Sequence, residues 1–226
     1  MNQAVAEKGY KGLGMEGFVA NWYASLTRKA MDDFKALARR VAGQIPPGSQ
    51  VLEVAPGPGY FAIELGKLGG YRVTGLDISH TFVEIARRNA AQAGVQVDFR
   101  EGNVADMPFE NETFDFLLCR AAFKNFTQPV RALEEMYRVL KPGGRALIID
   151  LRKDASKECI STAVDGMRLG AVNTVLTKLT FRFMLLKRAY TRKDFEQFLS
   201  QTNFGPNEIK EDLTGLELLL QRGRGA

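Results

Sequence analysis

Cysteine and histidine are scarce in this sequence, and their scarcity excludes several kinds of site. The chain has two cysteines, Cys119 and Cys159, and one histidine, His80. The cysteines lie in an apolar strand-like run and in a polar stretch, so we expect neither a disulfide framework nor a zinc site. His80 follows Ser79, a good helix N-cap residue, and is expected on the surface of a first helical turn rather than acting as a base. Metal catalysis has little support, and we predict no bound metal.

Long apolar runs are also missing. No stretch approaches about 18 consecutive apolar residues, the length needed to span a bilayer. The opening letters MNQAVAEKGY lack the apolar run and the flanks of a signal peptide, which favours a cytoplasmic location. With 45% hydrophobic and 25% charged residues, the 226-residue chain can bury one substantial core. We therefore predict a single domain over residues 1–226.

The net charge of +5 is unevenly distributed. Basic residues exceed acidic ones by three in residues 1–45 and by four in residues 151–226, whereas acidic residues are in excess by two in residues 46–150. A slightly acidic centre suits a cationic ligand. Basic flanks suit an anionic substrate, a membrane surface or nucleic acid, although they are equally consistent with solvated helix faces.

Strand-like and helix-like segments alternate through the middle of the chain. Strands are expected at 51–54, 72–77, 95–102, 114–120 and 145–151, and helices at 59–68, 79–93 and 128–140. This alternation predicts an α/β fold: a Rossmann-like doubly wound sheet, mostly parallel, with helices on both faces and ligands at the carboxyl ends of the strands. The runs NEIKEDL and GLELLLQR are expected to close the sheet, with an antiparallel closing strand.

Helical segments are expected on both sides of this core. Residues 16–43 place Trp22, Leu26 and later apolar residues at helical spacing, and Trp22 is expected to be a core residue. Thr191 and Asp194 predict a capping box at the start of a late helix. We divide the domain into an N-terminal helical cover (1–45), a core (46–152), a helical substrate cap (153–190, helical from 155) and a closing helix with strands (191–226).

The stretch GPGYFA carries the most informative motif. It fits Gly-x-Gly-x-x-Gly/Ala at Gly57, Gly59 and Ala62, and Asp77 lies 20 residues after Gly57, where a ribose-binding acid belongs. The turn alone would suit a dinucleotide. Glu53, at the end of the preceding strand, argues against one, because its charge would repel a pyrophosphate and attract a cation.

Five stretches, in this order and spacing, resemble the class I S-adenosylmethionine-dependent methyltransferases, in particular the small-molecule branch termed type 11. They are EVAPGPG (53–59), GLDIS (75–79), REGNVADMPF (100–109), FDFLLCRAAFKNF (114–126) and EEMYRVLKPGGRALIID (134–150). The resemblance covers roughly residues 45–152. It implies an enzyme whose cofactor is S-adenosylmethionine.

The resemblance also implies which residues bind the cofactor. Asp77 would accept hydrogen bonds from both ribose hydroxyls, Ile78 would pack on the adenine face, and Glu53 would attract the ammonium group. Backbone atoms would line the remainder of the site at four further residues, Ala55, Gly57, Gly59 and Val104.

Three implied cofactor residues need comment. The family usually has Asp where this chain has Asn103, whose carbonyl oxygen can still accept from the adenine amino group, with a weaker contact. Cys119 and Arg120 would end the fourth strand beside the sulfonium. The arginine departs from the family pattern, and we expect its guanidinium to point toward the methionine carboxylate rather than toward an anionic acceptor.

The reaction that the resemblance implies is methyl transfer by in-line displacement, in which alignment can matter more than any single base. Lys124 and Asn125 stand where the family often places polar active-site residues. Tyr23 and Tyr10 are candidates from the N-terminal cover. We predict these four as catalytic residues.

The acceptor depends on residues 172–190, which are apolar almost all round a helix. Six basic residues and no acidic residue occur from Lys178 to Lys193. This segment could pack on the core, line an apolar acceptor pocket through Phe181, Met184 or Leu185, or make peripheral membrane contact.

Motifs of the nucleic-acid methyltransferases are missing, so nucleic acid is not expected as a partner. We predict methyl transfer to a small, apolar or aromatic acceptor. An RNA or protein methyltransferase and a non-catalytic subunit that binds adenosylmethionine remain alternatives.

Overall fold

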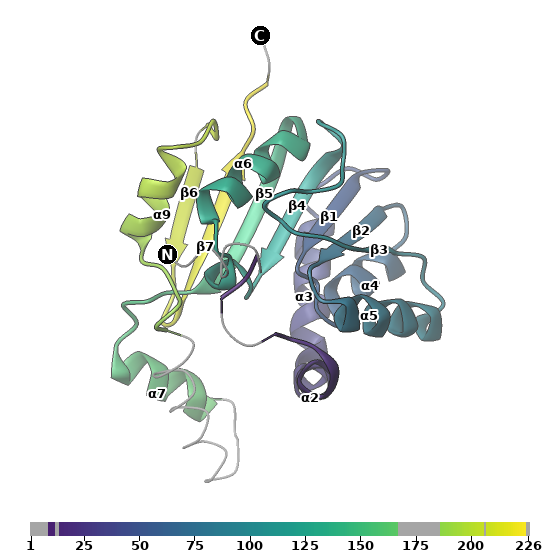
Figure 1. Ribbon diagram of the computed structural model, residues 1–226, viewed down its shortest axis with the longest axis horizontal. Helices are drawn as coiled ribbons and strands as arrows, with labels where there is room; N and C mark the ends of the chain where they lie inside the picture. The colour runs from purple at the N-terminus through teal and green to yellow at the C-terminus, as the bar shows by residue number, and fades with distance from the viewer. Residues whose placement is uncertain (1–8, 12–13, 167–185, 206, 225–226) are drawn as a thin grey trace.

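The computed structural model describes residues 9–11, 14–166, 186–205 and 207–224. Within these ranges the strands form one sheet of order β3-β2-β1-β4-β5-β7-β6 (Figure 1). The first five strands pair in parallel, and β7 pairs antiparallel with both β5 and β6. The predicted Rossmann-like sheet with an antiparallel closing strand is therefore confirmed. Its strands are β1 Gln50–Val54, β2 Arg72–Asp77, β3 Asp98–Glu101, β4 Phe114–Arg120, β5 Leu140–Leu151, β6 Asn207–Glu211 and β7 Gly215–Gln221.

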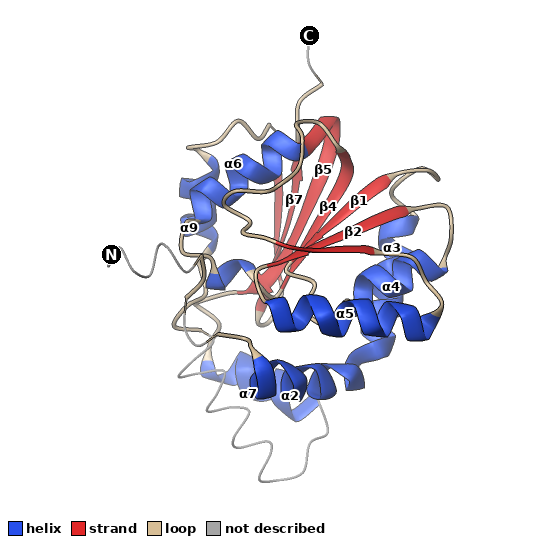
Figure 2. Cartoon of the chain, turned by 45° about the vertical axis from the view of Figure 1, so that its right-hand side comes forward, coloured by secondary structure: helices blue, strands red, loops and turns tan. Residues whose placement is uncertain are grey.

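Helices cover both faces of the sheet, with α3, α4 and α5 on one face and α6 and α9 on the other (Figure 2). Successive strand residues point to opposite faces, so Val51 packs on the α3 side and Leu52 on the α6 side. The helical elements are α2 Gly17–Thr27, η1 Arg28–Ala30, α3 Met31–Ala42, α4 Tyr60–Lys67, α5 His80–Ala93, η2 Phe123–Asn125, α6 Pro129–Val139, α7 Lys157–Gly166 and α9 Arg192–Leu199.

Two helix starts follow directly from the sequence. The Ser79 side chain accepts the Phe82 N–H at the start of α5, and the His80 side chain is 69% exposed, as expected for a first-turn surface residue. Thr191 and Asp194 form the predicted capping box at the start of α9.

The N-terminal helical segment differs from its prediction. Residues 16–43 form two helices separated by η1. Trp22 is 57% exposed, so the expectation that it belongs to the core was wrong. The reason is the direction of packing: α2 contacts α5 through Ala20, Ala24 and Tyr23, which leaves Trp22 on the outer side of the helix.

The predicted helical cap is described only in part. α7 forms its first section, and Leu186–Arg188 is a turn rather than the end of a helix. The predictions for Phe181, Met184 and Leu185 lie outside the described residues. In the part of the chain that is described, no helix is long and apolar enough to cross a membrane.

Candidate functional site

The turn between β1 and α4 has an unusual backbone. Its φ angles are 53° at Ala55, 54° at Gly57 and 77° at Gly59. Glycine adopts positive φ without a Cβ penalty, whereas Ala55 is strained there. A Cβ atom at Gly59 would also lie 2.6 Å from the Phe99 ring. The turn places the N-terminus of α4 at the carboxyl ends of the strands, where backbone N–H groups suit a nucleotide-like ligand.

Asp77 closes this turn from the end of β2. Its carboxylate accepts the Gly57 N–H at 2.9 Å and the Ser79 N–H at 2.9 Å, and the residue is only 5% exposed. Burial raises the pKa of Asp77 to about 6, although both N–H donors act in the opposite sense. A carboxylate offers about four lone-pair sites, so two remain for ligand hydroxyls.

Glu53 is buried on the α4 side of β1 and accepts the Ala62 N–H at 3.0 Å. Burial raises its pKa to about 8, against the opposing effects of that N–H and of Arg120. The carboxyl group is therefore largely protonated at neutral pH. A bound ammonium group would favour its ionised form, so cation binding here would release a proton.

The predicted adenine residues lie together beside the N-terminal segment. A Cβ atom at Gly9 would lie 2.5 Å from Ile78 Cδ1 and 2.8 Å from Asn103 Nδ2, so Gly9 packs directly on both side chains. Asn103 Oδ1 accepts the Ala105 N–H at 2.9 Å, which leaves this oxygen one further lone pair. Val104 is buried in the hydrophobic core.

The two predicted residues at the end of β4, Cys119 and Arg120, have different surroundings. Cys119 is fully buried in the hydrophobic core, and burial raises the pKa of its thiol well above the ordinary value. Arg120 places its guanidinium 4.5 Å from the centre of the Phe34 ring. Its charge also lowers the pKa values of Glu53 and Tyr23. Arg120 is therefore a cation near Glu53, and its contact with a methionine carboxylate stays a prediction.

Lys124 forms a buried ion pair that the sequence did not reveal. Its Nζ lies 2.8 Å from Asp150 Oδ1 and also donates to the Ala121 carbonyl, while its backbone N–H donates to Asp150 Oδ2 at 2.8 Å. Ala121 has φ of 57°. Asp150 thus holds the loop after β4 in shape. In the sequence, the signal for this role of Asp150 was its place at the end of the apolar run RALIID. Its pairing with Lys124 could not be predicted, because it depends on the pairing of β4 with β5.

The other catalytic candidates come from the N-terminal cover and η2. The Tyr23 ring packs edge-on against Phe82, with centroids 5.8 Å apart. Burial raises the pKa of Tyr23, an effect that Arg120 opposes and that Asp150 and Asp77 reinforce. Tyr23 therefore lies near the charges at the strand ends and stays protonated at neutral pH.

The segment containing Tyr10 is joined to η2 by backbone contacts. Tyr10 forms a β-bridge with Phe126, and the Lys11 N–H donates to the Asn125 carbonyl at 2.6 Å. The structure therefore brings Tyr10, Tyr23, Lys124 and Asn125 to one end of the sheet. Their catalytic roles stay predictions.

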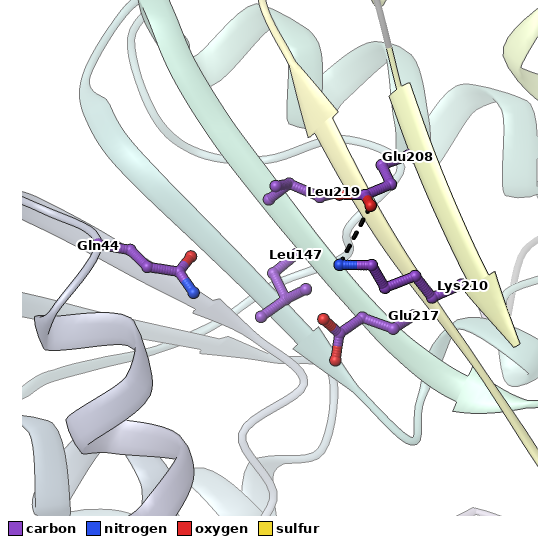
Figure 3. Close-up of a pocket in the computed structure, with 6 residues that line it drawn as sticks. All are labelled: Gln44, Leu147, Glu208, Lys210, Glu217 and Leu219. Atoms are coloured by element: carbon purple, nitrogen blue, oxygen red, sulfur yellow. Dashed lines mark ion pairs between the residues drawn. The ribbon is translucent and has the colours of Figure 1, made fainter. Parts of the chain in front are cut away.

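A separate pocket of about 70 Å³ lies on the α3 face of β5, β7 and β6 (Figure 3). It is lined by Gln44, Leu147, Glu208, Lys210, Glu217 and Leu219. None of the predicted site residues lines it, and the charged groups of its wall pair with neighbours, such as Glu217 with Arg40 at 2.7 Å. We assign it no role.

The sheet order, the positive-φ turn and the carboxylates at the ends of β1 and β2 form a Rossmann-like nucleotide site. The family described as "Methyltransferase domain" matches residues 52–148. Residues 52–148 are thus similar to a methyltransferase domain, and this similarity supports S-adenosylmethionine, the cofactor that the sequence predicts.

Curated relatives match about half of the chain. A demethylmenaquinone methyltransferase from Deinococcus radiodurans is 35% identical over 108 residues, which cover 47% of this chain and 45% of that protein. The ubiquinone/menaquinone biosynthesis C-methyltransferase UbiE from a Marinomonas species is 34% identical over 122 residues, 52% of this chain and 48% of the relative. The chain therefore spans about half the length of the curated relatives it matches.

Solved structures share the fold over more of the chain. A Methanococcus maripaludis protein, provisionally assigned as an S-adenosyl-L-methionine-dependent methyltransferase, aligns with a TM-score of 0.76 and 18% identity, covering 96% of this chain and 97% of that one. A SAM-dependent methyltransferase from Aquifex aeolicus aligns with a TM-score of 0.63 and 18% identity, covering 84% and 97%. At this identity the likeness shows the fold.

Proposed function

We propose that this protein transfers a methyl group from S-adenosylmethionine to a ring carbon of a small aromatic acceptor of the quinone class. The observation that supports this most directly is the similarity to the curated relatives over about half of each of them. The family match over residues 52–148 contains the glycine turn and Asp77. Those relatives are named for demethylmenaquinone and for carbon methylation. The overall reaction forms a carbon–carbon bond, breaks the carbon–sulfur bond, and releases the proton of the methylated ring carbon.

The cofactor residues are proposed from the site geometry. Asp77 accepts the ribose hydroxyls with its remaining lone pairs, and Ile78, Asn103 and Val104 form the adenine slot. Glu53 faces the ammonium group, and Arg120 faces the carboxylate. When bound, the cofactor supplies a methyl group on a positively charged sulfur. The backbone of three residues of the turn lies along the methionine part: Ala55, Gly57 and Gly59.

The acceptor residues are proposed at the junction of the N-terminal cover and η2. Tyr23, protonated at neutral pH, donates a hydrogen bond to an acceptor oxygen. Lys124 is fixed by Asp150, so its main contribution is to hold the loop after β4 and to direct positive potential toward an acceptor oxygen that loses its proton. Asn125 and Tyr10 are the remaining residues that we propose for the acceptor site. Alignment by such fixed groups can supply much of the rate enhancement.

The proposed organisation of the domain keeps the four segments predicted from the sequence. We propose that residues 1–45 cover the site, 46–152 hold the cofactor, 153–190 contribute to the acceptor side, and 191–226 complete the sheet. Small molecules are the proposed partners.

The test is a panel of reduced naphthoquinones, benzoquinones and catechols, incubated with protein and cofactor and scored by mass spectrometry for one added methyl group. Carbon methylation is then located by NMR. Asp77→Asn should lose turnover, whereas His80→Ala, an exposed control, should retain it. Methylated RNA or protein with no methylated quinone, or tight cofactor binding without any turnover, would contradict the proposal.

A further inference from the structure

Helix α2 carries large apolar side chains on its outside. Phe18 is 83% exposed, Trp22 57%, Leu26 48% and Val19 40%. Four of the six exposed large apolar side chains in the described part of the chain lie on this one helix. At about 100° per residue they fall within one side of α2. We call Phe18, Val19, Trp22 and Leu26 the α2 stripe.

The inner side of α2 carries two alanines and Tyr23. Ala20 and Ala24 are buried against Phe82 and Ile85 of α5, and the Ala24 carbonyl accepts the Tyr60 hydroxyl at 2.9 Å. A surface helix ordinarily buries its large apolar residues and exposes polar ones. In α2 four large apolar residues are exposed instead, and an exposed apolar patch of this kind marks an interaction surface.

Positive charge lies directly beyond the stripe. Arg28 and Lys29 follow α2 in η1 and are exposed. Neither forms a salt bridge with another of the described residues, although the charge of Arg28 opposes the rise that burial causes in the pKa of Tyr60. Aromatic and aliphatic side chains beside exposed cations suit a surface that is apolar below and negatively charged above, which is the boundary of an anionic lipid bilayer.

We propose that the α2 stripe inserts into the surface of an anionic lipid bilayer, with Arg28 and Lys29 on its phosphate groups. α2 lies beyond the strand ends at which the cofactor residues gather (Figure 1). On its inner side Tyr23 lies near Asp77 and Arg120. Docking would therefore bring the end of the sheet at which the cofactor residues lie to the membrane surface. The inference depends on no particular acceptor.

The chain has a built-in reporter, because Trp22 is its only tryptophan. Full-length protein is mixed with vesicles of phosphatidylcholine, with or without phosphatidylglycerol. The emission of Trp22 is expected to shift to shorter wavelength and to be quenched by brominated lipid. Phe18→Ser with Leu26→Ser, which keeps the reporter, should weaken binding by about tenfold for each lost side chain.

Two further variants make the test specific. Leu68→Ser with Leu213→Ser removes side chains that are 46% and 55% exposed on other elements, and should leave vesicle binding unchanged. Arg28→Glu with Lys29→Glu should weaken binding to anionic vesicles by at least tenfold and barely alter binding to neutral ones.

Three results would overturn the proposal. The first is unchanged Trp22 emission with every vesicle. The second is equal loss of binding in the Leu68 and Leu213 control. The third is a blue shift that depends on protein concentration without lipid, together with a doubled mass in sedimentation, which would make the stripe an interface between two copies of the chain.

Discussion

Replacing Glu53 by glutamine should remove a pH dependence from the stability of this protein. Glu53 is 4% exposed and makes one hydrogen bond, from the Ala62 N–H. Glutamine has the same shape as the protonated acid, and its carbonyl oxygen can accept the same hydrogen bond. The substitution therefore removes a titrating proton while leaving the packing nearly unchanged.

The sign and size of the effect follow from the two pKa values. Glu53 has an ordinary pKa of 4.5, which burial raises to about 8 in the folded protein. Between these values the folded state holds a proton that the unfolded state has lost, so the free energy of unfolding falls as pH rises from 4.5 to 8. At about 1.4 kcal/mol for each pKa unit, the fall is at most about 5 kcal/mol. Because the structure relaxes around the buried charge, we expect the measured fall in the free energy of unfolding to be smaller, about 2 kcal/mol.

The assay is urea unfolding of the wild type and Glu53→Gln between pH 5 and 9. We expect similar stability at pH 5 and a variant more stable by about 2 kcal/mol at pH 9. Asp77 titrates in both proteins, so the difference between them isolates Glu53. Glu84→Gln, an exposed glutamate of α5, should follow the wild type at every pH. Parallel curves for the wild type and Glu53→Gln would refute the reasoning.

Three further changes test other parts of the site. Asp77→Asn should lower the affinity for the demethylated cofactor product by about 10- to 150-fold in calorimetry, because a charged acceptor is lost; equal affinity would exclude the ribose contact. Gly59→Ala should lower the free energy of unfolding by about 2 to 4 kcal/mol, and Gly69→Ala, with a similar φ of 72° but open space, by only about 1 kcal/mol. Lys124→Met should lower the free energy of unfolding in urea by about 3 to 5 kcal/mol, because it leaves the Asp150 carboxylate buried without its cation. Adding Asp150→Leu should restore part of this free energy. No recovery in the double variant would show that an unpaired buried charge is not the cause.

The sheet was predictable because its parallel strands are buried on both faces. Such strands are short apolar runs bounded by turns, and β1 and β2 begin and end within a residue of their predicted bounds. β3 was predicted three residues too long at its start, at residue 95, because the apolar Val95 and Val97 pack on Gly66 outside the strand. Periodicity also failed to orient α2, since helical spacing does not show which side meets α5.

The candidate site was predictable where it depends on local sequence. The spacing of Gly57 and Asp77 predicted a ribose-binding acid beside a glycine turn. In the structure the turn has positive φ and Asp77 accepts the Gly57 N–H, while its contact with ribose stays a prediction. The partnership of Lys124 with Asp150 was not predictable, because 26 residues separate them and only the register of β4 on β5 brings them together. Long-range pairs of this kind carry no local signal.

The position of β7 has a consequence for synthesis of the chain. β7, although it comes last in sequence, lies between β5 and β6 in the sheet. While the ribosome is still making residues 152–214, the apolar edge of β5 has no neighbour on that side. An unpaired strand edge readily joins other chains. We therefore expect the nascent protein to depend on chaperones until Gly215–Gln221 emerges, and translation stalled in that interval to yield aggregates rather than a smaller folded product.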